Sequence, residues 1–417
     1  MDFGIFHKSR DEIENIQFNK IKKIVKYAFD HSAYYHQLYI SRGFNPEMLK
    51  SYADIKKIPI VKRIALKNTP VEQIVTKKNF EKLHVHTTSG SSGIPVGFYF
   101  DNRELFLKNY GVMRAYLKMG MKLSDTTVAF RDPIDIRKPG FFEKIHIMAY
   151  DYYNTYDSIE ESCRLICERY DKIDVLKGMP SDLLNLSYTI RKNKIKFPPI
   201  KLLISDCEVL DDFSRKYISE TLNNNILDYY ASVENGCIAF QLNGSNKYFI
   251  NEDQVLLENG NVDGAVGDVI ITNLRNTTFP IIRYQIGDVV DFGDGKSDIS
   301  GINLKTIDRI FGKYLDFIVL PDKTIISPHV PKQEMTHISG IKKFQLVQDS
   351  ISHIIVRIEK DSGYDEHVER DVLNRLNSAF KNQISCEIEY IDDLSQKTTR
   401  KFKVIESFVA QDFLSDL

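Results

Sequence analysis

A segment rich in glycine and hydroxyl side chains carries the clearest chemical signal in the sequence. Residues 86–100 read His-Thr-Thr-Ser-Gly-Ser-Ser-Gly-Ile-Pro-Val-Gly-Phe-Tyr-Phe. Glycine lets the backbone approach an oxyanion closely, and hydroxyls donate hydrogen bonds without adding charge. We therefore predict a loop that binds phosphate. Its candidate residues are Thr87, Thr88, Ser89, Gly90, Ser91, Ser92 and Gly93.

A solvated Ser/Gly linker would have a similar composition, so it is the alternative for this segment. Two features favour the phosphate loop. Pro95 stiffens the exit of the segment, and residues 96–100 immediately resume a strand pattern. A linker would not require such a frame.

Two carboxylates could serve the same ligand. Glu234 follows a strand-like run and precedes a glycine, where it could hold Mg²⁺ against bound phosphates. Alternatively, it is an acid that complements the dipole at the start of a helix. Asp288 follows Gly287 and could accept two hydrogen bonds from a ribose diol, whereas an Asx turn is the bland interpretation.

A basic loop lies near the end of the chain. Residues 394–403 contain Lys397, Arg400, Lys401 and Lys403. Such a loop is ordinarily solvated surface, and only its context could give it another role.

Composition narrows the classes of protein. The 417 residues hold 56 Lys and Arg against 57 Asp and Glu, a net charge of −1, which argues against a nucleic-acid partner or an anionic membrane surface. No stretch approaches the roughly 20 apolar residues that span a bilayer, and the first ten residues lack a signal core. The five cysteines form no zinc-type array, so we expect free thiols and a cytoplasmic protein.

The order of apolar patterns predicts an α/β fold. A helix is expected over 12–35, and strand and helix patterns then alternate from 103 to 230. Repeated units of this kind form a largely parallel sheet covered by helices on both faces. Ligands of such sheets sit beyond the carboxyl ends of the strands. Two strand ends therefore count as candidates, 205–208 (Ser-Asp-Cys-Glu) and 229–236 (Tyr-Tyr-Ala-Ser-Val-Glu-Asn-Gly).

The pattern changes twice in the second half of the chain. Short strands over 254–292 predict a small antiparallel or barrel-like subdomain. A strand over 346–358, a helix over 366–380 and a strand over 384–391 predict a compact C-terminal α+β domain. We place the boundary between domains 1–312 and 313–417.

The motifs in this order resemble the adenylate-forming superfamily, and most closely its phenylacetate-coenzyme A ligase and CapK-like branch. The similarity extends over nearly the whole chain. The stretches that carry it are the phosphate loop 87–95, the aromatic-to-glutamate motif 230–234, the ribose motif 283–288, the hinge 312–316 and the lysine loop 399–403.

The resemblance implies a role for each motif. The loop would hold the β- and γ-phosphates of ATP, with Thr88 and Glu234 near Mg²⁺. Lys401 would lie between the carboxylate and the α-phosphate, where charge builds up. Asp316 would be the hinge about which a mobile C-terminal lid domain rotates. The other implied ATP-binding residues are Ser205, Asp206, Glu208, Tyr229, Tyr230, Ala231, Ser232, Asp288, Arg309 and Lys313.

Two positions depart from the family pattern. Lys313 stands where the hinge usually has arginine, and a point charge cannot replace a planar fork bond for bond. Arg400 stands where the terminal loop usually has glycine, so Lys403 competes with Lys401 for the catalytic role.

The function implied is ATP- and Mg²⁺-dependent activation of a small carboxylic acid to an acyl-adenylate, with release of pyrophosphate. The acyl group would then pass to the thiol of coenzyme A or of phosphopantetheine on an acyl carrier protein. One alternative is adenylyl transfer without a thiol step. Another is an inactive nucleotide-binding assembly module in a polysaccharide or natural-product pathway. The phenylacetate branch also implies a homodimer.

Overall fold

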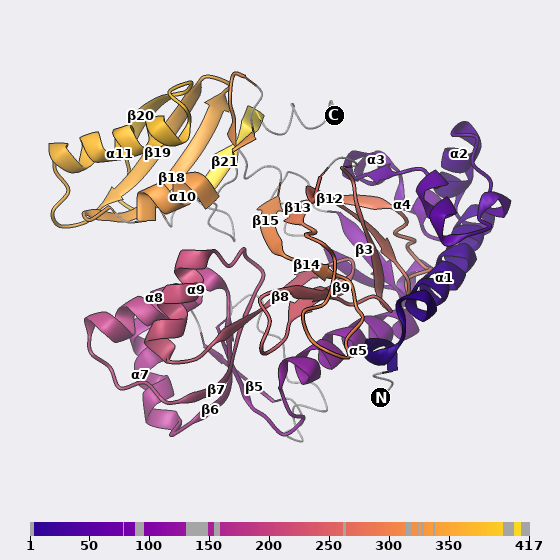
Figure 1. Cartoon of the computed structure of the whole chain (residues 1–417), viewed down its shortest axis with the longest axis horizontal. Coiled ribbons are helices and arrows are strands. Elements are labelled where there is room, and N and C mark those ends of the chain that lie inside the picture. The colour runs from indigo at the N-terminus through magenta and orange to yellow at the C-terminus, as the bar shows by residue number, and fades with distance from the viewer. Residues whose placement is uncertain are drawn as a thin grey trace. The chain divides into compact units, whose positions relative to one another are not determined.

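The computed structural model describes residues 4–77, 79–87, 96–130, 149–153, 159–261, 264–313, 318–322, 325–326, 329–336, 338–394 and 404–409. The chain forms two compact units. The first comprises Met1–Thr87, Val96–Ile286 and Val290–Ile310, and the second is built on Phe311–Leu417 and includes Gly287–Val289. Figure 1 shows the elements of each unit.

The main sheet of the first unit has eight strands among the described residues. The first five strands in the spatial order given below run parallel to one another, and the three remaining neighbouring pairs are antiparallel. The strands in spatial order are β5 (Tyr150–Tyr153), β4 (Thr127–Phe130), β6 (Ile173–Gly178), β7 (Ile200–Asp206), β8 (Ile226–Ser232), β9 (Gly236–Gln241), β10 (Tyr248–Ile250) and β14 (Thr306–Ile307).

Helices cover both faces of this sheet, as the alternating pattern predicts. On one face lie α7 (Ile159–Arg169), α8 (Pro180–Lys192) and α9 (Asp212–Leu222), whose apolar side chains pack with Leu176, Leu203 and Ile226 (Figure 1). On the other face lies α5 (Asn102–Met119), which packs its Ala115, Tyr116 and Met119 against the strands. The predicted doubly covered parallel sheet is confirmed.

A second sheet forms the predicted small β subdomain. Its strands are β1 (Val61–Lys62), β13 (Tyr284–Asp291), β12 (Val266–Asn273) and β11 (Val255–Asn259), in that order, with β15 (Arg309–Lys313) beside β13. β11 and β12 are antiparallel, whereas β1 joins β13 in parallel. A separate two-stranded sheet pairs β2 (His84–Thr87) with β3 (Gly97–Phe100).

The helix expected over 12–35 is two helices, α1 (Arg10–His31) and α2 (Ala33–Ser41). Ser32 separates them with extended backbone, and its hydroxyl accepts from Tyr35 N. Serine competes for backbone groups in this way and favours helix starts, which explains the break. The other elements of this region are α3 (Arg63–Asn68), α4 (Val71–Ile74) and the 3-10 turns Gly4–His7, Pro46–Met48, Tyr52–Lys57 and Phe80–Lys82.

The second unit contains a four-stranded sheet in the order β20 (Ser385–Tyr390), β19 (His353–Lys360), β18 (Ile341–Ser350), β21 (Ile405–Ser407). Apolar side chains of α11 (Glu366–Ala379) share a core with this sheet. The remaining described elements are β16 (Ile318–Val319), β17 (Ile325–Ile326) and α10 (His329–Thr336).

The single strand expected over 346–358 was wrong. β18 and β19 form an antiparallel hairpin that turns at Ile351 and Ser352. The apolar side chain of Ile351 hid the turn from the alternating pattern, although Asp349, Ser350 and Ser352 are typical turn residues.

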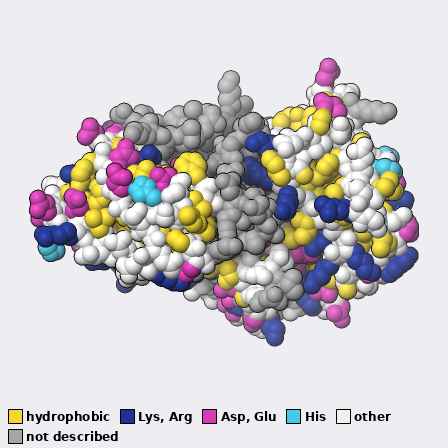
Figure 2. Space-filling view, turned by 90° about the horizontal axis from the view of Figure 1, so that it is seen from above, with side chains coloured by type: hydrophobic (Ala, Val, Ile, Leu, Met, Phe, Trp, Pro, Cys, Tyr) yellow, Lys and Arg dark blue, Asp and Glu magenta, His cyan; other side chains and the backbone are white. Residues whose placement is uncertain are grey.

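The face in Figure 2 carries both acidic and basic side chains among the described residues. Within the described part of the chain, no helix is both long enough and apolar enough to cross a membrane.

Candidate active site

The structure brings together the two strand ends that the sequence singles out. β7 and β8 are neighbours in the main sheet, with Asp206 opposite Tyr229 and Ser205 opposite Asp228. Because paired residues of parallel strands point to the same face, Asp206 and Tyr229 face one side of the sheet and Ser205 and Asp228 the other. Both sets lie toward the carboxyl ends of the parallel strands, where ligands bind in folds of this kind.

The side toward α5 carries a buried ion pair that the sequence prediction missed. Lys177, near the end of β6, lies 2.8 Å from an oxygen of Asp206, and the two side chains are 7% and 5% exposed. The Lys177 ammonium also donates a hydrogen bond to the Tyr116 hydroxyl of α5. Tyr229 stacks on Tyr116 at a ring-centroid distance of 4.9 Å. A lysine inside the apolar run of β6 was the available signal for this cluster.

The opposite side carries a second buried carboxyl, that of Asp228. Asp228 accepts from the Ser205 hydroxyl at 2.5 Å and from the Tyr248 hydroxyl at 2.6 Å. Burial raises the pKa of Asp228, and the two hydroxyl donors and the charge of Arg215 offset part of that rise. Two differently satisfied aspartates therefore flank the strand ends.

The residues after Tyr229 continue toward the metal candidate. Tyr230 is buried in the core that contains the second sheet. Ala231 is exposed and Ser232 is half-buried at the end of β8. Ser232 pairs with Gly236 of β9, so the three residues between them form a tight turn.

Glu234 lies in that turn between β8 and β9. The turn connects two antiparallel strands, so the alternative of an acid at the start of a helix is excluded. Glu234 is 3% exposed, and its backbone carbonyl accepts from Asn273 Nδ2 at 3.3 Å. The turn that carries the Glu234 carboxylate is therefore braced, and it lies at the ends of two interior strands of the sheet.

Lys108 of α5 lies beneath the same turn. Its Nζ donates to the carbonyl of Val233 at 2.5 Å and lies 3.3 Å from His86 Nδ1. Burial lowers the pKa of Lys108 to about 8, and the charge of Glu234 opposes that shift. Sequence analysis did not single out Lys108, because its partners are far away along the chain.

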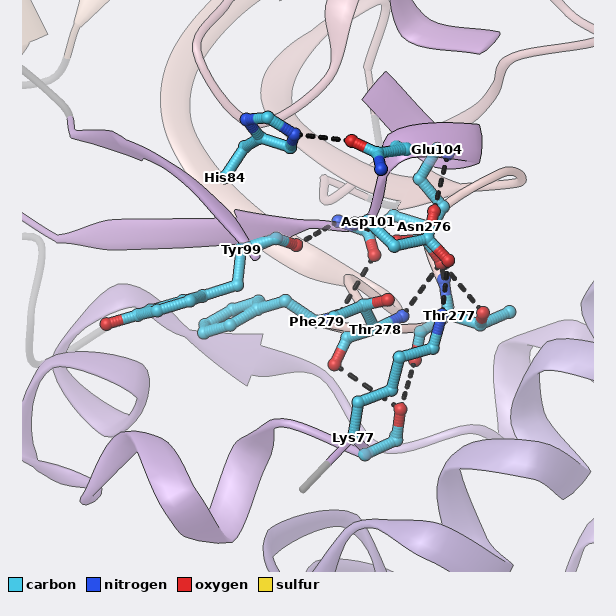
Figure 3. A network of polar contacts seen from close by, with 11 residues as sticks. Lys77, His84, Tyr99, Asp101, Glu104, Asn276, Thr277, Thr278 and Phe279 are labelled. Carbon is cyan, nitrogen blue, oxygen red and sulfur yellow. Dashed lines mark hydrogen bonds and ion pairs between the residues drawn. The ribbon is translucent and has the colours of Figure 1, made fainter. Parts of the chain in front are cut away.

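A network of polar contacts fixes the start of α5 (Figure 3). Asp101 and Glu104 form a capping box, with Glu104 N donating to Asp101 at 2.7 Å and Asp101 N donating to Glu104 at 3.0 Å. The other oxygen of Glu104 accepts from the backbone N–H groups of Thr277 and Thr278 at 2.8 and 3.0 Å. Lys77 adds an ion pair to Asp101. The helix that carries Lys108 is thus tied to the loop before β13.

The two strands that flank the predicted phosphate loop pair with each other. β2 and β3 are antiparallel, and Thr87 lies opposite Gly97. The strands before and after residues 88–95 therefore belong to one two-stranded sheet. Residues 88–95, which include the candidates Thr88 to Gly93, lie outside the described residues.

Asp288 lies within β13 and not in a turn. Gly287 has a φ of +82°, a value that glycine adopts easily, so the strand continues past it. Asp288 is 8% exposed. Asp288 therefore does not lie in the Asx turn that was the alternative for this residue, and its role in binding ribose stays a prediction.

The remaining candidate residues are Arg309, Lys313, Glu208, Asp316, Lys401 and Lys403. Arg309 forms an exposed ion pair with Asp212 at 2.9 Å, and Lys313 is the last residue of β15. Glu208 is half-buried, and its N–H donates to the Asp206 carbonyl at 2.9 Å. Between these two acids, Cys207 is exposed and has a φ of +70°. Asp316, Lys401 and Lys403 lie outside the described residues.

The chain is similar to known proteins over most of its length. Residues 318–407 match the CapK C-terminal domain. Over 395 residues, the chain is 22% identical to protein CapK of Staphylococcus aureus, covering 92% of this chain and 87% of CapK. It is 21% identical over 413 residues to phenylacetate-coenzyme A ligase of Pseudomonas putida, covering 90% and 89% of the two chains.

Solved structures share the fold. A 2-hydroxyisobutyryl-CoA ligase in the postadenylation state superimposes with a TM-score of 0.76 at 18% identity, covering 98% of this chain and 93% of that chain. ATP-bound MatB from Rhodopseudomonas palustris superimposes with a TM-score of 0.54 at 14% identity, covering 81% and 69%.

These matches confirm two predictions. The chain has the fold of adenylate-forming ligases. Its resemblance to the CapK and phenylacetate-coenzyme A ligase branch holds over about nine tenths of its length. The comparisons also agree with an adenylate-forming ligase as the class of enzyme.

Proposed function

We propose that this chain activates a carboxylic acid with ATP and Mg²⁺, forming an acyl-adenylate and releasing pyrophosphate. The acyl group then passes to the thiol of coenzyme A or of a carrier-protein phosphopantetheine. The observation that carries the proposal is the placement of Asp206, Tyr229 and Glu234 at adjacent strand ends in a fold shared with acyl-adenylate-bound ligases.

The first step requires alignment and charge neutralisation rather than a protein nucleophile. A carboxylate oxygen attacks the α-phosphorus of ATP, and pyrophosphate leaves. AMP is a good leaving group, so a thiolate can then attack the acyl carbon and displace it. The loop at 87–93 would hold the β- and γ-phosphates, and Lys401 would contact the carboxylate and the α-phosphate.

The residues present fit a magnesium ion bound through phosphates. Mg²⁺ in such sites takes one or two protein carboxylates and completes its shell with water and phosphate oxygens. Glu234 is a carboxylate on a braced turn, and Thr88 could add a hydroxyl. When bound, Mg²⁺ would neutralise the charge of the phosphates.

The nucleoside would lie along the same strand ends. In the proposal, Tyr230 flanks the adenine, while Ser205 to Glu208 and residues 229–232 line the adenine pocket. Asp288 binds the ribose hydroxyls.

The test is carboxylate-dependent exchange of labelled pyrophosphate into ATP over aryl, fatty, hydroxy and amino acids. We expect exchange with one class of acid, and a loss on the order of 100-fold in Glu234→Gln, or about 2.7 kcal/mol of transition-state stabilisation. Glu72→Gln, the same change at an exposed position of α4, is the matched control and should exchange normally.

Two further variants assign the lysine. Lys401→Ala should abolish exchange while Lys403→Ala retains it, and the reverse result would move the role to Lys403. Mg²⁺-ATP binding without exchange for any acid would contradict the ligase activity and favour a nucleotide-binding assembly module. Exchange with AMP remaining on the product in the presence of thiols would favour adenylyl transfer.

A further inference from the structure

One side chain of α5, Lys108, contacts both parts of the predicted site. These parts are the Glu234 turn, which is expected to hold the metal, and the strand that leads into the predicted phosphate loop. Lys108 Nζ donates to the carbonyl of Val233, the residue before Glu234, at 2.5 Å. The same atom lies 3.3 Å from Nδ1 of His86, in the strand that leads into the phosphate loop. Residues 86 and 233 are distant along the chain, and one ammonium group links them.

Both the ammonium group and the methylene stem of Lys108 lie in close contact with other residues. The ammonium lies 4.5 Å from the centroid of the Phe100 ring, a cation–π contact. Gly236, which ends the Glu234 turn, has a φ of +70°, and a Cβ there would lie 2.9 Å from Lys108 Cγ. The turn therefore rests directly on the lysine stem.

The base of Lys108 is itself fixed. Lys108 lies one helical turn after Glu104, whose carboxylate is bonded to Thr277 and Thr278 (Figure 3). Because the start of this helix is fixed, Lys108 can hold the turn that it contacts in a defined position. The charge-assisted bond to Val233 is of the stronger kind, because its donor is ionised.

We propose that Lys108 is a positioning residue that holds the Glu234 turn and the strand entering the phosphate loop in the arrangement that binds Mg²⁺-ATP. It acts through the backbone of Val233 and through His86, not by touching the reacting atoms. The inference rests on the proposed function, because it assigns Glu234 to the metal.

The chain offers a matched control. Lys20 of α1 is also a half-buried lysine whose Nζ donates to a backbone carbonyl, that of Asp253 at 2.8 Å. Burial lowers the pKa of Lys20 to about 8, as it does for Lys108. Lys20→Met and Lys108→Met therefore remove equivalent groups, but only the second lies beneath Glu234.

The experiment measures ATP binding by calorimetry with and without Mg²⁺ in wild type, Lys108→Met, Lys20→Met, Glu234→Gln and the Lys108→Met/Glu234→Gln double variant. We expect Lys108→Met to raise the Kd of Mg²⁺-ATP about tenfold, and the metal-free Kd less. Lys20→Met should leave both unchanged. In the Glu234→Gln background, Lys108→Met should add less than a twofold loss, because the turn no longer holds the metal.

Additive losses in the double variant, or equal effects of Lys108→Met and Lys20→Met, would overturn the proposal. If wild type itself shows no Mg²⁺-dependent ATP binding, the proposed function fails and takes this inference with it, which distinguishes the two failures. If Lys108→Met does not fold, Lys108→Gln keeps a donor on a shorter stem and should raise the Mg²⁺-ATP Kd by a smaller factor. An unchanged Kd in Lys108→Gln would also overturn the proposal.

Discussion

Asp206 and Asp228 are both 4% exposed and lie on neighbouring strands, yet they are satisfied in different ways. Asp206 faces α5 and pairs with the Lys177 ammonium at 2.8 Å. Asp228 faces the other side of the sheet and accepts from two neutral hydroxyls. Burial alone therefore does not determine how the charge of a carboxyl is compensated. A cation compensates its charge, whereas hydroxyls leave much of the desolvation cost in place.

The largest effect should follow from removing the cation. Lys177→Met leaves the Asp206 carboxylate buried without its counter-ion, so we expect a loss of about 3 to 5 kcal/mol in the free energy of unfolding. Lys177→Met combined with Asp206→Leu should recover most of that loss, because no buried charge is left alone. Urea unfolding of wild type and both variants measures the difference. A single-variant loss below about 1 kcal/mol would show that the pair is not coupled.

An intermediate, pH-dependent effect is expected at Asp228. Its pKa in the folded state is raised above the ordinary value of 3.8, so the folded protein holds this proton more tightly than the unfolded chain. The stabilisation is fully present below about pH 4 and is lost as pH rises through the folded pKa, at up to about 1.4 kcal/mol per pH unit.

Asp228→Asn cannot ionise, so this variant should become more stable relative to wild type as pH rises from 4 to 8. Urea unfolding across that range provides the measurement. If the difference between the two proteins does not change with pH, the carboxyl has the same pKa in the folded and unfolded states, and the contrast with Asp206 disappears.

The smallest effect should come from Tyr248→Phe. It removes one of the two hydroxyl donors to Asp228, and we expect a loss of about 1 kcal/mol at pH 7. Because the lost donor favours the ionised form, the pKa of Asp228 should rise further, and the pH dependence should extend to higher pH. Asp228→Asn/Tyr248→Phe is the control, since the added pH dependence must vanish with the carboxyl.

Local patterns in the sequence predicted most of the main sheet. β7 and β8 lie where short apolar runs are bounded by turn residues, and α9 begins after Asp211, which caps it through a bond to Ser214 N. The order of motifs also located the strand ends that carry Asp206 and Glu234. These features depend on residues close together in the sequence, so periodicity and capping reveal them.

Other features depend on which strands become neighbours. Lys177 meets Asp206 only because β6 and β7 pair, and Lys108 meets Val233 only because α5 passes under the turn after β8. No local pattern encodes those meetings. The break between α1 and α2 was missed for a different reason, because the apolar spacing continues across Ser32 while the capping hydroxyl interrupts the helix.

Cys207, the exposed residue that follows β7, is a natural site for covalent labelling. Burial raises the pKa of the Cys163 and Cys237 thiols to about 12 and that of Cys386 to about 11, and it also raises the pKa of Cys167. These thiols will react slowly with maleimides near neutral pH, whereas Cys207 is exposed. A fluorophore attached there stands one residue from both Asp206 and Glu208, so the wild-type sequence, without an engineered cysteine, can test the proposal that nucleotide binds at this strand end.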